Sequence, residues 1–444
     1  MENRTIEASP TKEFFIFMLT RDVLLTRAII DLVDNCVDGA RRMRPTEGYL
    51  GLEISMEVSP EKFVVKDNCG GISIDVARNY AFRFGRPTKA PNTKHSVGQF
   101  GVGMKRTFFK LGKKIFIESF TKTSRFTMHI DVDRWLEEDD SVGNWHFKFD
   151  EIEENIVVPD DQVGTYIEVT DLLQEPKQSF GSPNFARDLE LALAQDHAIV
   201  ISEGLTISLN GKNIYNFPLE LSSSGKIRPS YVEKKYYEED ENPIDIKILA
   251  GVSKREKQDG GWYVFCNGRM VLRADQNFVT GWGEQEGNKM PKYHPDFAYF
   301  RGFVFFDCQD ASKLPWTTTK TGVDSDSWIY RTVRGEMIEA ARPILAFLRE
   351  LSNERAEVAQ GDRDSSELEE ILESSPITSI GEISQVSAFS APKSAPRSGP
   401  RMQKIKYSRL FEDVEAVKSH LGVKTFTDVG IRTFEYYQEY ELNS

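Results

Sequence analysis

Apolar residues recur at the three- and four-residue spacing of a helix through residues 12–44, and Pro45 and Gly48 end this run. Short segments that alternate apolar and polar residues follow, and they predict strands. These segments are 52–58, 62–67, 114–120, 126–132 and 165–172. Because helices and strands do not alternate regularly, the pattern predicts an α+β fold, in which one sheet carries helices on one face. We expect this first domain to span residues 1–185.

A second pattern begins further along the chain and predicts a second domain over residues 186–352. Two pairs of strands turn at Asn-Gly dipeptides, at 210–211 and at 267–268. Asn-Gly is the preferred sequence of tight two-residue hairpin turns. A strand at 300–308 and a helix at 328–352 complete this domain.

The composition changes at residue 353, after which Ser, Glu, Pro and Ala become frequent. Such a segment buries too little apolar surface to fold alone, so it predicts a disordered linker over 353–404. The last segment, 405–444, regains apolar spacing and predicts two amphipathic helices separated by Gly422 and Lys424.

The chain of 444 residues has a formal net charge of −13. This acidity argues against a general nucleic-acid binder, although a net charge does not describe local surfaces. The four cysteines form no C-x-x-C pair, so we expect neither a disulfide framework nor a structural zinc site. No apolar stretch has the length of a membrane span, and the first residues do not form a secretory leader. We therefore expect a cytoplasmic protein with no membrane partner.

Three polar residues share one face of the first predicted helix. In DLVDNCVDGA, residues 31–40, Asp31, Asn35 and Asp38 occupy positions i, i+4 and i+7. An amide oxygen suits Mg²⁺, which prefers oxygen ligands and binds together with phosphates. A carboxylate one turn earlier is suited to deprotonate a water. The alternative is a solvated acidic face with no ligand.

Two further segments place polar groups at strand ends. In VVKDNCGGIS, residues 64–73, Asp67 precedes two glycines, which permit positive φ and a close approach of the backbone to a ligand. Its carboxylate is suited to accept a hydrogen bond from an exocyclic amine. In GTYIEVTDL, residues 164–172, the Thr165 hydroxyl is suited to contact a base or a bound water. A tight surface turn and ordinary strand propensity are the respective alternatives.

The segment 96–112, SVGQFGVGMKRTFFKLG, has Gly98, Gly101 and Gly103 ahead of a helix that is predicted to begin near Met104. The free N–H groups and the positive dipole at a helix N-terminus favour phosphate. A glycine-rich loop by itself is a weak signal.

Together, and in this order, the four segments resemble the ATP-binding fold of the GHKL superfamily (gyrase, heat-shock chaperones, histidine kinases and MutL). VGQFGVG is similar to the heat-shock chaperones, whereas DLVDN-x-x-D and GTYIEVTDL are closer to MutL and the microrchidia ATPases. The resemblance covers residues 12–175 and continues to residue 345, where the second region looks like the family's transducer domain. It implies a Bergerat-type α/β sandwich that binds ATP and Mg²⁺.

The resemblance also implies a role for each matching residue. Asp31 would be the general base, Asn35 the Mg²⁺ ligand and Asp67 the acceptor for the adenine amine. In LPWTTTKTGVD, residues 314–324, Lys320 would reach the γ-phosphate, although an exposed loop lysine is the alternative. The other implied nucleotide-binding residues are Asp38, Gly71, Gly98, Gln99, Phe100, Gly101, Val102, Gly103, Lys105 and Thr165.

The chain departs from the family's pattern at two positions. Glutamate is usual where Asp31 stands, and aspartate is shorter by one methylene, which reduces its reach by ~1 Å. Cys69 stands in place of the first glycine of the D-x-G-x-G motif, although Gly70 and Gly71 follow.

Two functions follow from the resemblance. The first is a slow ATPase that acts as a conformational switch, closing into a homodimer when ATP is bound. Within it, a DNA clamp competes with a chaperone-like remodeller, and the net charge does not indicate DNA. The second is an ATP-binding scaffold without turnover, which recruits a protein partner through its C-terminal helices.

Overall fold

The computed structural model describes residues 10–85, 94–98, 101–138, 145–238, 241–283, 290–395 and 405–442. Contacts within the chain divide it into two units. The first unit comprises Met1–Ser352 and Leu368–Lys393, and the second comprises Asn353–Glu367 and Ser394–Ser444. The first unit contains two domains, each built around a sheet of its own. None of the helices in the described ranges combines the length and the apolar character that a membrane crossing requires.

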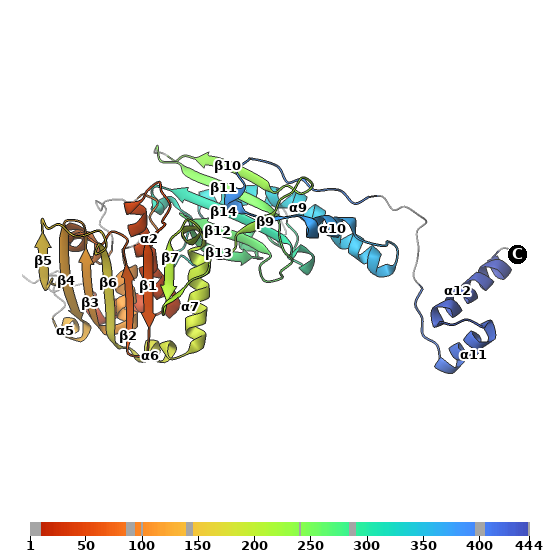
Figure 1. Ribbon diagram of the computed structural model, residues 1–444, viewed down its shortest axis with the longest axis horizontal. Helices are drawn as coiled ribbons and strands as arrows, with labels where there is room; N and C mark the ends of the chain where they lie inside the picture. Colours follow the sequence, from red (N-terminus) through yellow and green to blue (C-terminus); the bar gives the residue numbers. More distant parts are fainter. Residues whose placement is uncertain are drawn as a thin grey trace, which may run out of the picture. The chain divides into compact units, whose positions relative to one another are not determined.

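A mixed sheet in the order β5-β4-β3-β6-β2-β1-β7-β8 forms the centre of the first domain (Figure 1). Its strands are β1 (Glu53–Val58), β2 (Lys62–Asp67), β3 (Gly112–Phe120), β4 (Ser124–Asp131), β5 (Glu151–Glu154), β6 (Gly164–Leu172), β7 (Thr206–Leu209) and β8 (Lys212–Asn213). In β1, Ile54, Met56 and Val58 are buried while the residues between them are exposed. One face of the sheet therefore packs against helices and the other meets solvent.

The helices of this domain supply the rest of its core. They are α1 (Lys12–Thr20), α2 (Leu25–Met43), α3 (Ile74–Val76), α4 (Gly103–Leu111), α5 (Val132–Glu137), α6 (Gln174–Phe180), α7 (Pro183–Asp196) and α8 (Ala198–Ser202). Ile29 and Val33 of α2 and Phe108 of α4 are fully or almost fully buried in one cluster with the sheet. The single helical run predicted over 12–44 is thus two helices, because the chain is extended at Leu24. The predicted α+β class is confirmed.

A second sheet, ordered β10-β11-β14-β12-β13, forms the second domain. The elements here are β9 (Glu220–Ser222), β10 (Ser230–Tyr236), β11 (Ile244–Val252), β12 (Gly261–Cys266), β13 (Arg269–Asp275), β14 (Phe300–Cys308), β15 (Ile377–Ser379), α9 (Trp328–Gln360) and α10 (Glu367–Ser374). Every residue of β12 is buried. This is because Tyr330 and Val333 of α9 cover one face, while Phe217 and Leu219 belong to a cluster on the other.

The boundary between the two domains lies further along the chain than residue 185. The hairpin around Asn210 belongs to the first sheet, since β7 pairs in parallel with β1. Its Asn-Gly turn was predicted correctly, but its domain was not. Residue 210 has φ +50° and residue 211 has φ +77°, the left-handed conformation that such a turn requires.

The prediction of a disordered linker over 353–404 is wrong for much of its length. Leu368 and Leu372 of α10 are buried in the core of the second domain, and β15 pairs with β9. These two leucines stand four residues apart, which places them on one face of a helix despite the polar composition around them. Residues 396–404 of the predicted linker lie outside the described ranges.

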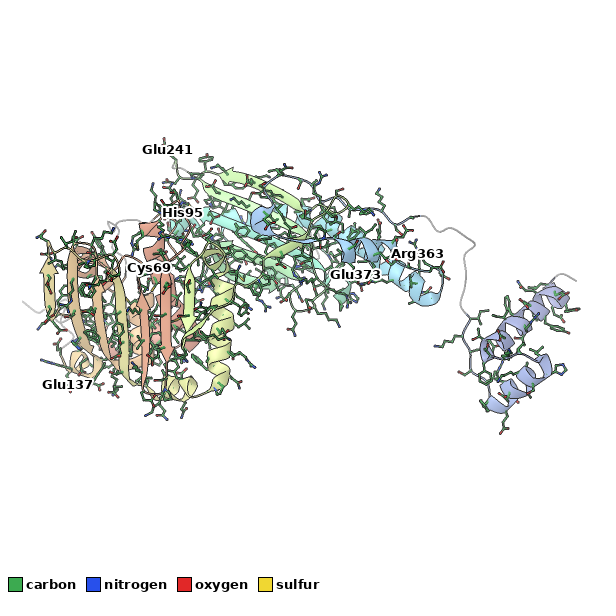
Figure 2. The ribbon with its side chains drawn as sticks, in the orientation of Figure 1. Cys69, His95, Glu137, Glu241, Arg363 and Glu373 are labelled. Carbon is green, nitrogen blue, oxygen red and sulfur yellow. The ribbon has the colours of Figure 1, made fainter. Side chains whose placement is uncertain are left out.

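The second unit carries the two C-terminal helices that the sequence predicted, α11 (Phe411–Leu421) and α12 (Phe426–Tyr437). Phe411 and Phe426 pack edge to face across the hairpin, with ring centroids 5.9 Å apart. In the earlier part of this unit, Arg363, labelled in Figure 2, donates from Nη1 to Glu354 at 2.7 Å.

Candidate nucleotide-binding site

The three polar residues of α2 lie beside a cavity of about 500 Å³. Asn35 and Asp38 line it, and Asp31 lines a smaller cavity next to it. Asp31 and Asp38 are buried, at 6% and 5% exposure, so the alternative of a solvated acidic face is wrong. Asn35 is exposed, and no described residue hydrogen-bonds its side chain, which leaves the amide open to a ligand.

Asp67 lies at one end of this cavity, at the tip of β2, next to Cys69 at the upper edge of the first sheet in Figure 2. Its Oδ1 accepts from the Cys69 N–H at 2.7 Å, and its Oδ2 accepts from the Cys36 thiol at 3.3 Å. Burial raises the pKa of Asp67, and these hydrogen bonds lower it in part. A carboxylate with two oxygens has lone pairs left for a further donor, such as an amine.

The strand pairing places Thr165 opposite Asp67. The Thr165 hydroxyl lies 3.1 Å from that of Ser119, and both side chains are buried. Gly71 adopts φ +67°, and a Cβ there would lie 2.0 Å from the carbonyl oxygen of Phe120. Only glycine fits this position, so the turn after β2 can pack closely against Phe120 beside the cavity.

The glycine-rich segment is anchored to α2 by Asp38. Its Oδ1 accepts from the Val97 N–H and its Oδ2 from the Gly98 N–H, both at 2.8 Å. Burial raises the pKa of Asp38, against the attraction of Arg41. Asp38 therefore supports the loop at the edge of the cavity, and because it also lines the cavity its contact with a nucleotide stays a prediction.

The described residues of the rest of the loop line the two cavities. Gly98 and Gly101 line both, while Val102 and Gly103 line the smaller one. A Cβ at Gly103 would lie 3.2 Å from that of Asp31, so the loop passes close to α2. Gln99 and Phe100, which the resemblance also implied, lie outside the described residues.

The smaller cavity, of about 60 Å³, brings the two predicted catalytic residues together. Asp31 forms a salt bridge from Oδ2 to Nη2 of Arg106 on α4. Its Oδ1 lies 3.3 Å from Nζ of Lys320, which comes from the second domain. Lys320 is 5% exposed, so the alternative of an exposed loop lysine is wrong.

Local backbone structure holds Lys320 in place. The loop around it is closed by the Thr317 N–H donating to Gly322 O at 3.0 Å and the Lys320 N–H donating to Thr317 O at 2.9 Å. Lys320 itself has φ +54°. A non-glycine residue in this region costs of order 1–3 kcal/mol, and such strain is concentrated at functional sites.

Lys320 has a closer partner in Asp34, whose Oδ2 lies 2.7 Å from Nζ. Asp34 is fully buried, and its Oδ1 also meets Arg269 Nε and His197 Nε2, each at 3.0 Å. Burial alone would raise the pKa of Asp34. The charges of Lys320 and Arg269 outweigh that effect and, with His197, hold the pKa well below its ordinary value.

Arg269 continues this network, because its Nη1 lies 2.8 Å from Asp196 at the end of α7. Asp196 also pairs with Arg27 on α2. The charged groups thus connect α2, α7 and the second sheet. The pairing of Asp34 with Arg269 could not be predicted from the sequence, because the two positions are 235 residues apart.

Lys105 lines the smaller cavity from the first turn of α4. It is buried, and its ammonium donates to the carbonyl oxygens of Ala81, at 2.9 Å, and Gly101. Burial lowers the pKa of Lys105 to about 7. An anion in this cavity would favour the charged form.

Among the described residues, no group of three or more His, Cys, Asp or Glu side chains is arranged to hold a metal ion. An Mg²⁺ ion usually keeps several waters and binds to few protein oxygens together with substrate phosphates. The open Asn35 amide beside the glycine loop fits that mode of binding. A larger cavity of about 1360 Å³ does not include Asp31, Asn35 or Asp67.

Comparison with known proteins agrees with this geometry. No curated protein matches the chain. A family model described as histidine kinase-, DNA gyrase B- and HSP90-like ATPase matches residues 23–165. That range contains α2, the turn after β2, the glycine-rich loop and Thr165. Residues 23–165 are thus similar to the ATPase domain that histidine kinases, DNA gyrase B and HSP90 share.

Proposed function

We propose that the protein is a Mg-ATP-dependent switch, in which the third phosphate of ATP ties the second domain to the first. The observation that carries this proposal is the position of Lys320. Its ammonium comes from the second domain and lines the same small cavity as Asp31, Asn35 and the glycine loop. A nucleotide with its amine at Asp67 and its phosphates along Asn35 would point its last phosphate at Lys320.

The site supports hydrolysis by direct attack of water. The water oxygen forms a bond to the γ-phosphorus, the bond from that phosphorus to the β,γ-bridging oxygen breaks, and ADP leaves. Asp31 accepts the proton of the attacking water. Lys320 stabilises the charge that develops on the transferred group, because its ammonium is held in a buried site where that interaction is strong.

Asn35, together with the nucleotide's own phosphates and waters, would hold Mg²⁺. The ion, when bound, offsets phosphate charge. Asp38 and Gly98 hold the loop beside the phosphates, and Asp67 orients the base.

The second candidate is an ATP-binding scaffold with little or no turnover. Asp31 favours it, because Arg106 and Lys320 both face the carboxylate that would have to accept a proton. The C-terminal hairpin favours it as well, since Phe411, Phe434 and Tyr437 are exposed and are suited to contact a protein partner.

Single-turnover phosphate release, measured with enzyme in excess over ATP, separates the two candidates. The switch predicts complete release in the wild type and loss of release in Asp31→Asn, with ATP binding retained in both. A wild type that binds ATP and releases no phosphate would favour the scaffold. Release at the wild-type rate in Asp31→Asn would remove Asp31 from its role as the base.

A further inference from the structure

The small cavity has an excess of positive charge. Lys105, Arg106 and Lys320 line it, and Asp31 is the one carboxylate among the described residues that line it. Lys320 lies closer to Asp34 than to Asp31, at 2.7 Å against 3.3 Å. Even with Lys320 assigned to Asp34, Arg106 and the partly charged Lys105 face the cavity against the one carboxylate of Asp31. Buried charges normally have partners, so this arrangement is suited to an anion.

Arg106 is the cation whose donors are least satisfied. It is buried at 9% exposure, and its Nη2 pairs with Asp31. Its Nε has no hydrogen-bond partner although that atom is buried. A guanidinium has five N–H donors, and a buried donor without an acceptor is costly. An anion in the cavity would supply the acceptor that the protein does not.

The position of Arg106 in the first turn of α4 also favours contact with a phosphate. The backbone N–H of Arg106 donates to the carbonyl oxygen of Val102 at 2.9 Å. The backbone N–H groups earlier in the first turn of α4 have no acceptor within the helix. They stand beside the glycine loop at the positive end of the helix. The cavity of about 60 Å³ is about twice the volume of one water in the liquid, roughly 30 Å³. A terminal phosphoryl group is of this order of size.

We propose that Arg106 binds the third phosphate of ATP, so that this phosphate is gripped by a guanidinium from the first domain and an ammonium from the second. The inference rests on the proposed function of the site. The planar fork of the guanidinium matches two phosphoryl oxygens, which a point charge such as Lys320 does not. The alternative role is structural, in which Arg106 merely neutralises Asp31.

The two roles of Arg106 predict different effects of its substitution on the affinity for ADP. A residue that contacts the third phosphate discriminates between ATP and ADP, because ADP lacks that group. A residue that only neutralises Asp31 affects both nucleotides alike through the shape of the site. The ratio of the two affinities is therefore the readout that a structural role does not move.

The test is calorimetric titration of full-length Arg106→Gln and Arg106→Lys with Mg²⁺ and either a non-hydrolysable ATP analogue or ADP. The matched control is Lys110→Gln, one turn further along α4, where the ammonium pairs with Glu175 at 3.0 Å outside the cavity. Arg106→Gln should reduce the affinity for the ATP analogue by about tenfold or more and the affinity for ADP by less than about twofold. Lys110→Gln should change neither.

Arg106→Lys keeps the positive charge and loses the planar guanidinium. It should therefore reduce the affinity for the ATP analogue several-fold and leave the affinity for ADP unchanged. It carries the test alone if Arg106→Gln does not fold. Unchanged analogue affinity, or an equal loss for analogue and ADP, overturns the role of Arg106 and leaves the proposed function intact. A wild type that binds neither nucleotide overturns the proposed function itself.

Discussion

Asp34 is the point at which removing one charge should destabilise the protein most. Its carboxylate is fully buried and contacts Lys320, Arg269 and His197. Asp34→Asn keeps the shape of the side chain and removes the charge. Lys320 and Arg269 would then face a neutral amide inside a buried cluster, and the amide nitrogen would oppose one of the donors.

The expected loss follows from that environment. Removing one partner of a buried ion pair costs about 3–5 kcal/mol, because the remaining charge stays buried. Here two cations lose their common anion, although Arg269 keeps Asp196 at 2.8 Å and Lys320 keeps Asp31 at 3.3 Å. We therefore expect a loss of about 3 kcal/mol, which is a large part of the total stability of about 5–15 kcal/mol that a domain has.

The pH dependence gives an independent check. The pKa of Asp34 in the folded protein lies well below its ordinary value of 3.8. The contribution of charged Asp34 to the free energy of unfolding is therefore fully present above pH 3.8. It is lost as the pH falls through the lower pKa that Asp34 has in the folded protein. The free energy of unfolding of the wild type should fall across this acidic range, and that of Asp34→Asn should fall less steeply.

Urea unfolding of the full-length wild type and Asp34→Asn, followed by circular dichroism, measures the loss. Glu190→Gln is the control, because it removes an ion pair to Lys212, whose side chain is 73% exposed. Exposed pairs contribute about 0–1 kcal/mol. A free energy of unfolding for Asp34→Asn within about 0.5 kcal/mol of the wild-type value would mean that the buried charge of Asp34 does not stabilise the fold.

Four further predictions test the nucleotide site. Asp67→Asn should reduce the calorimetric affinity for both ATP and ADP by about tenfold or more, since it replaces a charged acceptor, and unchanged affinity would remove the adenine assignment. Gly71→Ala should lower both the unfolding midpoint and nucleotide affinity, because its Cβ would lie 2.0 Å from Phe120 O, whereas alanine at the open Gly211 or Gly85 positions meets no such atom. Nucleotide affinity should fall as the pH rises above about 7, because burial lowers the pKa of Lys105 to about 7 and bound phosphate needs its charged form; a Lys105→Gln protein with the same pH profile would refute this. Light scattering should detect a homodimer with the ATP analogue and not with ADP, and an unchanged mass in both states would argue against an ATP-dependent dimer.

The local parts of this account could be predicted from the sequence. The strand at Phe300–Cys308 was predicted with its observed bounds, because its run of apolar residues is buried on both faces. The placement of Asp31, Asn35 and Asp38 on one face of α2 was predicted from helical periodicity. The choice of Lys320 as a residue of the nucleotide site was predicted from the family resemblance.

The partners of these residues could not be predicted. Asp34 meets His197 and Arg269 at sequence separations of 163 and 235 residues, and no local pattern signals such a pairing. Arg106 lies in a glycine-loop segment that was read for its backbone, so its side chain was overlooked. A clue was available, since charged side chains are rarely buried without a partner, and Asp34 sits between Val33 and Asn35 on a largely buried helix.

The central claim is that the third phosphate of ATP engages Lys320 and so connects the two domains. The most direct test is calorimetric titration of the wild type and Lys320→Ala with a non-hydrolysable ATP analogue and with ADP, each with Mg²⁺. We predict that the wild type binds the analogue more tightly than ADP, and that Lys320→Ala reduces this preference by weakening binding of the analogue about tenfold while ADP affinity stays nearly the same. An analogue-to-ADP preference that is the same in both proteins would contradict the claim.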